Sequence, residues 1–218
     1  MVPVLRLFRF RSAAPGFDAK IRDVLIPDVV RLPGNLAAYA GRIGPDDDGK
    51  RLIATVWESR AAMAASVGEG FEAPVFHPEL LAGSMDRDLD VLEMACVLPP
   101  DRYADAGIVR LVTGQTRPGE IGAYVGAAGA GAASDRDAGV GPVALYLAIR
   151  EPDRFATLSL WDSWDHLEQA TGADTRVVGR TRHDELLDHW EAEHYEAIPG
   201  IPAPAVLPIA SNPSSVPA

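Results

Sequence analysis

Hydrophobic and polar residues alternate with a period of two in several short segments, the pattern typical of β-strands. In the first half of the chain this pattern predicts strands over residues 4–10, 35–43, 51–57 and 89–98. Helix propensity and Pro-Gly punctuation predict helices over 17–31, which Pro27 disturbs, and over 59–67. The predicted order of elements is therefore β-α-β-β-α-β.

The second half of the chain follows the same plan. The pattern predicts strands over 108–113, 143–150, 154–161 and 188–198, with helices beginning at about Glu120 and covering 163–170. The Gly/Ala-rich stretch from Gly126 to Gly131 neither follows a strand nor opens a βαβ unit, so it lacks the context of a dinucleotide loop. We interpret it as a slack loop.

The two halves also share a sequence motif. VWES around Trp57 is echoed by LWDS around Trp161, which lies 104 residues later. In both, an acid-Ser pair that can start a helix follows a strand that ends in Trp. The offset between the halves changes only at presumed loops, as insertions in a duplicated domain would produce. This pattern predicts units over 1–104 and 105–198 and a Pro-rich tail over 199–218.

Composition excludes some classes of partner. The 218 residues carry a formal net charge of −11 with no basic stripe, which disfavours nucleic-acid binding. No apolar run approaches the length of a membrane span, and arginines interrupt the apolar N-terminus, so we expect no membrane partner and a cytoplasmic location. The single cysteine, Cys96, excludes an intrachain disulfide and is typical of inert buried filling.

The β-α-β-β-α-β units and their Val56-Trp57-Glu58-Ser59 and Leu160-Trp161-Asp162-Ser163 junctions resemble the dimeric α/β-barrel superfamily. This superfamily includes antibiotic-biosynthesis monooxygenases, haem-degrading monooxygenases and stress-responsive barrel proteins. The resemblance implies an α+β fold in which two ferredoxin-like units pack their antiparallel sheets into a pseudo-dimeric barrel within one chain, leaving a further homodimer open. It also implies a small-molecule ligand and, if the protein is catalytic, cofactor-independent oxygenation of an aromatic or polyketide-like substrate.

Four residues are candidates for ligand binding. If the leucines of the first strands pack under the helices, Arg6 and Arg110 point to the opposite face, toward the barrel interior, where they could hold a carboxylate. Alternatively, they pair with acids of the last strands, such as Glu93 or Glu191. Trp57 and Trp161 are candidates as well, although each can equally end a strand and anchor the helix that follows.

Three residues are candidates for catalysis. Tyr39 and Tyr146 occupy corresponding places in the second strands, where a phenol could orient a substrate or donate a proton. Such a tyrosine can also simply pack its ring and hydrogen-bond its hydroxyl group. His194 shares a strand face with Trp190 and Glu196 and could act as an acid or base, or lie in an ion-paired edge.

Haem binding is the alternative that the resemblance offers. Haem-degrading members carry a ligating His some twenty residues past the strand-to-helix junction, and His77 lies at that distance from Trp57, as His183 does from Trp161. This chain lacks the Trp late in the helix and the Asn of the first strand that accompany haem there. The remaining alternative is a non-enzymatic stress-responsive barrel. Asp46-Asp47-Asp48-Gly49 lacks EF-hand spacing and predicts a turn, not a Ca²⁺ site.

Overall fold

The structure is a computed structural model that describes residues 1–12, 15–43, 49–68, 84–99, 106–150, 152–171 and 183–200. The described chain divides into two compact units, the first formed by residues 1–91 and 195–200 and the second by residues 92–194. The predicted junction between the units, the turn at Asp46–Asp48 and the tail beyond residue 200 lie outside the described residues.

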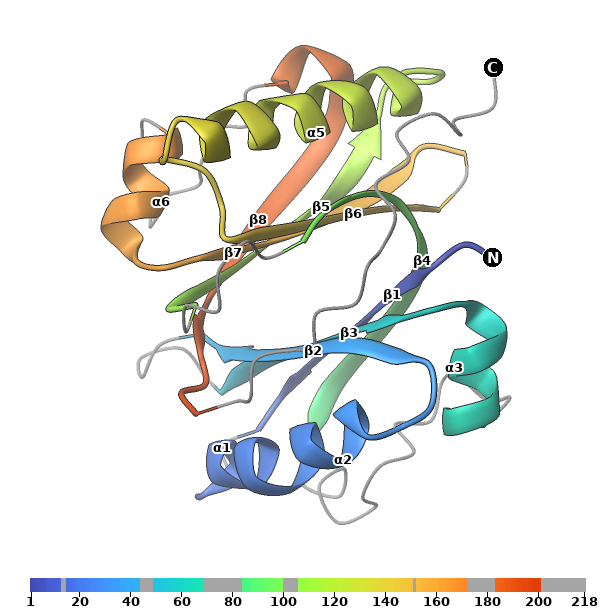
Figure 1. Cartoon of the computed structure of the whole chain (residues 1–218), viewed down its shortest axis with the longest axis vertical. Helices are drawn as coiled ribbons and strands as arrows, with labels where there is room; N and C mark the ends of the chain where they lie inside the picture. The colour runs from blue at the N-terminus through green and yellow to red at the C-terminus, as the bar shows by residue number, and fades with distance from the viewer. Residues whose placement is uncertain are drawn as a thin grey trace. The chain divides into compact units, whose positions relative to one another are not determined.

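The first unit is a sheet covered by helices (Figure 1). Its elements are β1 (Val4–Arg11), α1 (Phe17–Lys20), η1 (Ile21–Leu25), α2 (Ile26–Val30), β2 (Asn35–Arg42), β3 (Lys50–Trp57) and α3 (Arg60–Val67). The segment η1 is a π-helical turn directly before Pro27, which stands in the first turn of α2. Proline cannot donate an amide hydrogen bond. The hydrogen-bond pattern therefore changes to the π-helical form before Pro27, and the α-helix continues after it. The predicted helix disturbed at Pro27 is confirmed.

The second unit has the corresponding elements. They are β5 (Ile108–Thr116), α5 (Ile121–Asp137), β6 (Ala144–Arg150), β7 (Arg154–Trp161), α6 (Trp164–Thr171) and the single turn η2 (Asp184–Leu186). Strand registers correspond between the units, since Val4 pairs with Trp57 and Ile108 pairs with Trp161.

Two long strands, β4 (Met85–Leu98) and β8 (Leu187–Ala197), each belong partly to both units. The hydrogen-bonded order is β4-β1-β3-β2-β8 in the first unit and β8-β5-β7-β6-β4 in the second. This confirms the predicted α+β fold class, with two ferredoxin-like units and antiparallel strands.

Each unit packs its helices on one face of its sheet. In the first unit, Phe8 and Phe10 of β1 share a core cluster with Ile21, Ile26 and Met63 of the helices. In the second, Val112 of β5 and Phe155 of β7 pack with Tyr124 and Val125 of α5. Successive side chains of a strand point to opposite faces of the sheet, so these contacts show which face of each strand lies under the helices.

The repeated Trp-acid-Ser junction starts a helix in both units, as predicted. The Oγ atom of Ser59 accepts a hydrogen bond from the amide of Ala62 at 3.1 Å, and that of Ser163 accepts one from His166 at 3.2 Å. These are N-cap contacts, which satisfy an amide that the helix itself cannot.

The prediction of a slack loop over Gly126–Gly131 is wrong, because these residues form the middle of the 17-residue helix α5. Close packing explains the small residues there. A Cβ on Gly129 would lie 2.8 Å from the Sγ atom of Cys96 on β4, so a larger residue there would require the Cys96 side chain to shift. Tertiary contact outweighs the low helix propensity of glycine.

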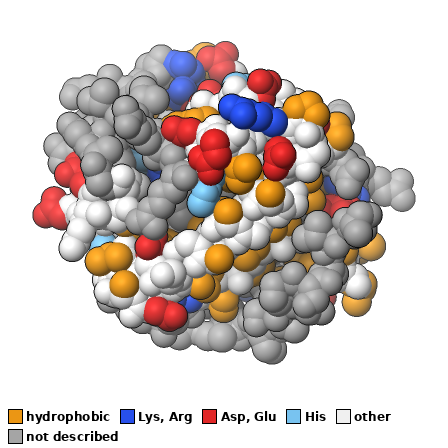
Figure 2. All heavy atoms as spheres, turned by 90° about the horizontal axis from the view of Figure 1, so that it is seen from above, with side chains coloured by type: hydrophobic (Ala, Val, Ile, Leu, Met, Phe, Trp, Pro, Cys, Tyr) orange, Lys and Arg blue, Asp and Glu red, His pale blue; other side chains and the backbone are white. Residues whose placement is uncertain are grey.

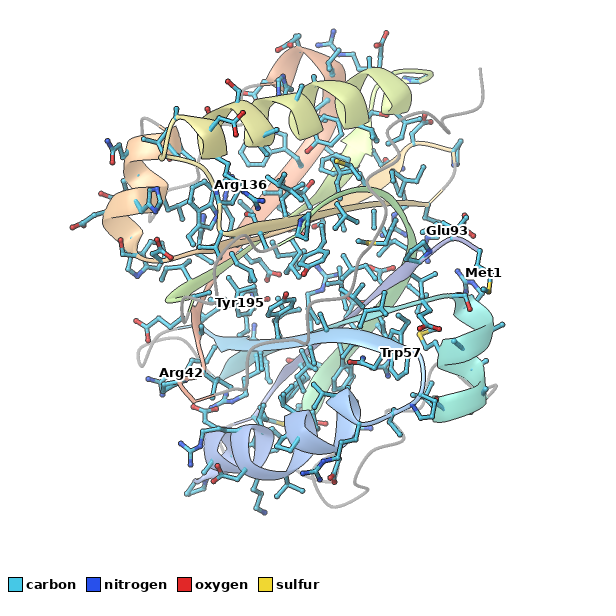
Figure 3. The ribbon with its side chains drawn as sticks, viewed as in Figure 1. Met1, Arg42, Trp57, Glu93, Arg136 and Tyr195 are labelled. Atoms are coloured by element: carbon cyan, nitrogen blue, oxygen red, sulfur yellow. The ribbon has the colours of Figure 1, made fainter. Side chains whose placement is uncertain are left out.

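One arginine ties α5 to the strands beneath it (Figure 3). Arg136 donates to the carbonyl oxygens of Pro99 at 2.7 Å and Val143 at 2.8 Å. Pro99 directly follows β4 and Val143 directly precedes β6, and Arg136 gives each of these carbonyls a hydrogen-bond donor. Among the described residues, no helix is long and apolar enough to cross a membrane.

Candidate functional site

Arg110 stands in the middle of β5 and is the charged residue around which the candidate site is formed. Its cross-strand partner on β7 is Ser159, which in turn pairs with Leu145 on β6. Residues that face each other across strands share a face of the sheet. Because Val112 and Leu145 pack against α5, this row lies on the face that the helix covers.

The predicted orientation of the two arginines is therefore wrong. Arg6 shares its face with Val4 and Phe8, which pack under the helices of the first unit, and Arg110 shares its face with Val112. The leucines of these strands, such as Leu5, lie on the opposite face.

Trp161 orients the hydroxyl group beside Arg110. Its indole Nε1 donates a hydrogen bond to Ser159 Oγ at 2.9 Å. A serine oxygen that accepts this bond keeps its own proton to donate elsewhere. Arg110 and Ser159 thus present N–H and O–H donors side by side, an arrangement suited to an anionic oxygen.

The guanidinium group of Arg110 is buried, and its Nε and Nη2 atoms have no hydrogen-bond partner. Burial lowers the pKa of Arg110, and the nearby Tyr124 opposes this shift in part. A cation of this kind is costly unless a partner of opposite charge meets it. The position therefore favours a negatively charged ligand.

A cavity of about 130 Å³ opens beside Arg110. It lies within the second unit, between the sheet and the helices α5 and α6. Its polar lining includes Ser159, Thr157 and His183, and its apolar lining includes Trp161 and Leu145. Figure 2 looks onto the outside of this unit, where small hydrophobic side chains are scattered among other groups.

Tyr124 of α5 lines the cavity with a phenol that burial keeps protonated. Its hydroxyl group lies 3.4 Å from Thr157 Oγ1, and desolvation raises its pKa. Its ring packs on Phe155 with centroids 4.4 Å apart and meets the ring of His183 edge-on at 6.4 Å. Tyr124 can therefore donate a hydrogen bond or a proton to a ligand next to Arg110.

His194 lies near Arg110, but it is not among the described residues that line the cavity. Burial, aided by the positive charge of Arg110, lowers its pKa to about 4. Its ring lies 5.6 Å from that of Trp164, and its Nε2 atom has no hydrogen-bond partner. At neutral pH it is an uncharged imidazole.

This pKa predicts a loss of stability in acid. Between about pH 6.5 and about pH 4, the unfolded chain binds a proton on His194 and the folded chain does not. The free energy of unfolding therefore falls as the pH is lowered through this window, and His194 contributes no pH dependence above it. Urea unfolding of His194→Gln at several pH values should show a shallower acid loss than the wild type.

His189→Gln is the matched control, because His189 is exposed on the same strand. Its pH profile should follow that of the wild type. An unchanged acid loss in His194→Gln would show that His194 does not titrate as its surroundings imply.

The structure places the two predicted catalytic tyrosines away from this cavity. Tyr146 pairs with Leu158 on the face of the sheet opposite α5, and Tyr39 holds the corresponding position opposite Ala54 in the first unit. Both are buried. They are not brought together with Arg110 or Tyr124.

The first unit repeats part of the site. Arg6 pairs with Thr55 across β1 and β3, and Trp57 Nε1 donates to Thr55 Oγ1 at 2.9 Å. Trp57 is fully buried in the first unit (Figure 3). Arg6, Thr55 and Trp57 each lie 104 positions before Arg110, Ser159 and Trp161.

The cavity beside Arg110 is smaller than a haem group. A volume of about 130 Å³ is close to the ~150 Å³ that accommodates benzene, and a porphyrin is several rings larger. His183 lines this cavity, whereas His77 lies outside the described residues, so its haem role stays a prediction. In the described part of the chain, no three His, Cys, Asp or Glu side chains gather as metal ligands.

Reasoning from sequence missed Tyr124, Thr157 and Ser159 as site residues. A signal was present, since Tyr124, Ala128, Gly131, Ala132 and Asp135 recur at helical spacing and all line the cavity. Glycine and alanine carry so little hydrophobic contrast that this periodicity is weak.

Comparison with known proteins gives a structural match without a sequence match. No protein-family model matches the chain, and no curated protein matches it in sequence. Proteins assigned as monooxygenases from Lactobacillus acidophilus and Fusobacterium nucleatum superpose with TM-scores of 0.67 and 0.66 at 11% and 10% identity. These matches cover 91% and 90% of this chain and 95% and 93% of the other chains.

An anthrone oxidase-like protein superposes with a TM-score of 0.51 at 16% identity, covering 90% of this chain and 92% of that one. At such identities the likeness concerns the fold. The chain shares its fold with these proteins and with a ferredoxin-fold protein from Listeria monocytogenes that is related to antibiotic biosynthesis monooxygenases.

Proposed function

We propose that this protein binds a small aromatic molecule with an ionised oxygen in the cavity of its second unit. The observation that carries the proposal is the buried guanidinium of Arg110, whose Nε and Nη2 atoms have no partner and which lines that cavity. Ser159 adds an O–H donor, because its oxygen already accepts from Trp161. An anionic oxygen would satisfy both groups.

The size and walls of the cavity favour a single aromatic ring. Its volume of about 130 Å³ is close to that of engineered cavities that take benzene, at ~150 Å³. The indole of Trp161 and the side chains of Val112 and Leu145 supply apolar contact. A larger ring system would fit only by extending beyond the cavity.

We further propose that the reaction, if one occurs, is an oxygenation that needs no cofactor; the names of two proteins with this fold, a monooxygenase and an anthrone oxidase-like protein, support oxidation chemistry. An electron-rich phenolate gives electrons to dioxygen, which places one oxygen atom on a ring carbon and leaves the other as water. For phloroglucinol, C₆H₆O₃ and O₂ become dihydroxybenzoquinone, C₆H₄O₄, and H₂O. Arg110 would stabilise the phenolate, and Tyr124 and His183 would move protons at the ring oxygens.

Binding can be tested with salicylate, which combines one ring, a carboxylate and a phenol. Calorimetric titration should show that Arg110→Gln weakens salicylate binding by at least about tenfold, the effect of losing a charge-assisted hydrogen bond. Arg117→Gln, which alters an exposed arginine of the same unit, should bind as the wild type does.

Salicylamide, which has no carboxylate, should bind weakly to both the wild type and Arg110→Gln. Equal salicylate affinity in wild type and Arg110→Gln would overturn the proposed anion site.

Turnover is tested separately with phloroglucinol and isotopically labelled dioxygen. The expected result is one labelled oxygen atom per molecule of quinone product, with loss of the rate in Tyr124→Phe or Arg110→Gln. Binding without turnover would leave the protein as a small-molecule binder. A shift of the haem Soret band on titration with haemin, abolished in His77→Ala, would instead favour the haem alternative.

A further inference from the structure

The first unit contains a buried charge that the proposed aromatic site does not use. Arg6 is 3% exposed, and its Nε and Nη2 atoms have no hydrogen-bond partner. Burial lowers its pKa to about 10, so it remains a cation at neutral pH. An isolated buried cation is among the most costly features of a folded protein, because water no longer solvates it.

A hydroxyl donor lies next to this cation. Thr55 is the cross-strand partner of Arg6, and its Oγ1 accepts a hydrogen bond from Trp57 Nε1 at 2.9 Å. Accepting that bond leaves the threonine proton free to be donated to a third group. Arg6 and Thr55 therefore present donors on one face of the sheet, as Arg110 and Ser159 do in the second unit.

The surroundings of Arg6 differ from those of Arg110 in the size of the flanking side chains. Phe8 and Ile53 stand at the positions that Val112 and Thr157 hold in the second unit, and both belong to the core of the first. The guanidinium groups of Arg6 and Arg110 are both buried. The larger side chains around Arg6 therefore leave room for a smaller partner.

We propose that Arg6 and Thr55 bind a small inorganic anion of the halide class, such as chloride, within the first unit. A halide supplies the missing charge and accepts hydrogen bonds from several directions without the bulk of an organic acid. This site is independent of the aromatic site at Arg110, so each can fail without the other.

The test measures unfolding midpoints of the full chain as chloride replaces gluconate at constant ionic strength. The wild type should be stabilised by chloride in a saturable manner, because a ligand that binds only the folded state raises its stability. Arg6→Gln should lose this response, whereas Arg110→Gln should keep it. No response in the wild type, or an equal response in Arg6→Gln, would overturn the proposal.

Two further measurements keep the proposal testable if Arg6→Gln does not fold. Thr55→Val should raise the half-saturating chloride concentration by at least about tenfold, because one hydrogen bond to an anion is lost. Crystals grown in bromide should show anomalous density beside the Arg6 guanidinium. Absence of that density, or an unchanged half-saturating concentration in Thr55→Val, would contradict the site.

Discussion

Ala132→Phe is expected to lower salicylate affinity by about 100-fold or more while leaving the protein folded. Ala132 is buried on the inner side of α5 and lines the cavity beside Arg110. A phenyl ring fills a cavity of this size, since ~150 Å³ accommodates benzene. The ring and the ligand would then have to occupy the same space, which excludes the ligand.

The matched control is Ala130→Phe, the same substitution two residues earlier on the exposed side of α5. It should bind salicylate as the wild type does. Calorimetric titration gives the affinities, and urea unfolding shows whether each variant is folded. If Ala132→Phe binds salicylate normally, the ligand does not enter this cavity.

The elements of the fold were predictable from sequence because their patterns are local. Alternation identified β1 and β5, and the acid-Ser pairs after Trp57 and Trp161 identified helix starts that the structure confirms. The two ferredoxin-like units were predicted from a resemblance in sequence, and the structural matches support that fold.

The orientation of the arginines was not predictable from that alternation. Both faces of β1 are buried, with Leu5 and Leu7 on one side and Val4 and Phe8 on the other. When both faces exclude water, hydrophobic and polar alternation cannot tell which one the helices cover. The choice depends on packing between segments far apart in the chain.

The cavity was missed for a related reason. Gly129 looked like a loop residue because its helix propensity is low, whereas its role is to let α5 approach Cys96. Once α5 is a helix, Tyr124 is carried over the strand that holds Arg110. A tyrosine in a Gly/Ala-rich segment gives no such signal by itself.

The largest expected loss of stability follows from Trp57→Ala, which should lower the free energy of unfolding by about 3–5 kcal/mol. Trp57 is fully buried in the core of the first unit, and its indole donates to Thr55. Removing it leaves a large cavity and a threonine oxygen that has lost its donor, and both effects destabilise the folded chain. Urea unfolding followed by circular dichroism measures the change.

Two variants separate these effects. Trp57→Phe keeps most of the apolar volume and loses the hydrogen bond, so it should cost about 1–2 kcal/mol. Trp164→Ala removes a half-buried tryptophan that starts α6 and should cost less than about 2 kcal/mol. A loss in Trp57→Ala no greater than in Trp164→Ala would show that Trp57 does not anchor its core.

Trp161 holds in the second unit the position that Trp57 holds in the first. Trp161→Phe should weaken salicylate binding in the calorimetric titration, because phenylalanine cannot donate the hydrogen bond that fixes Ser159 as a donor.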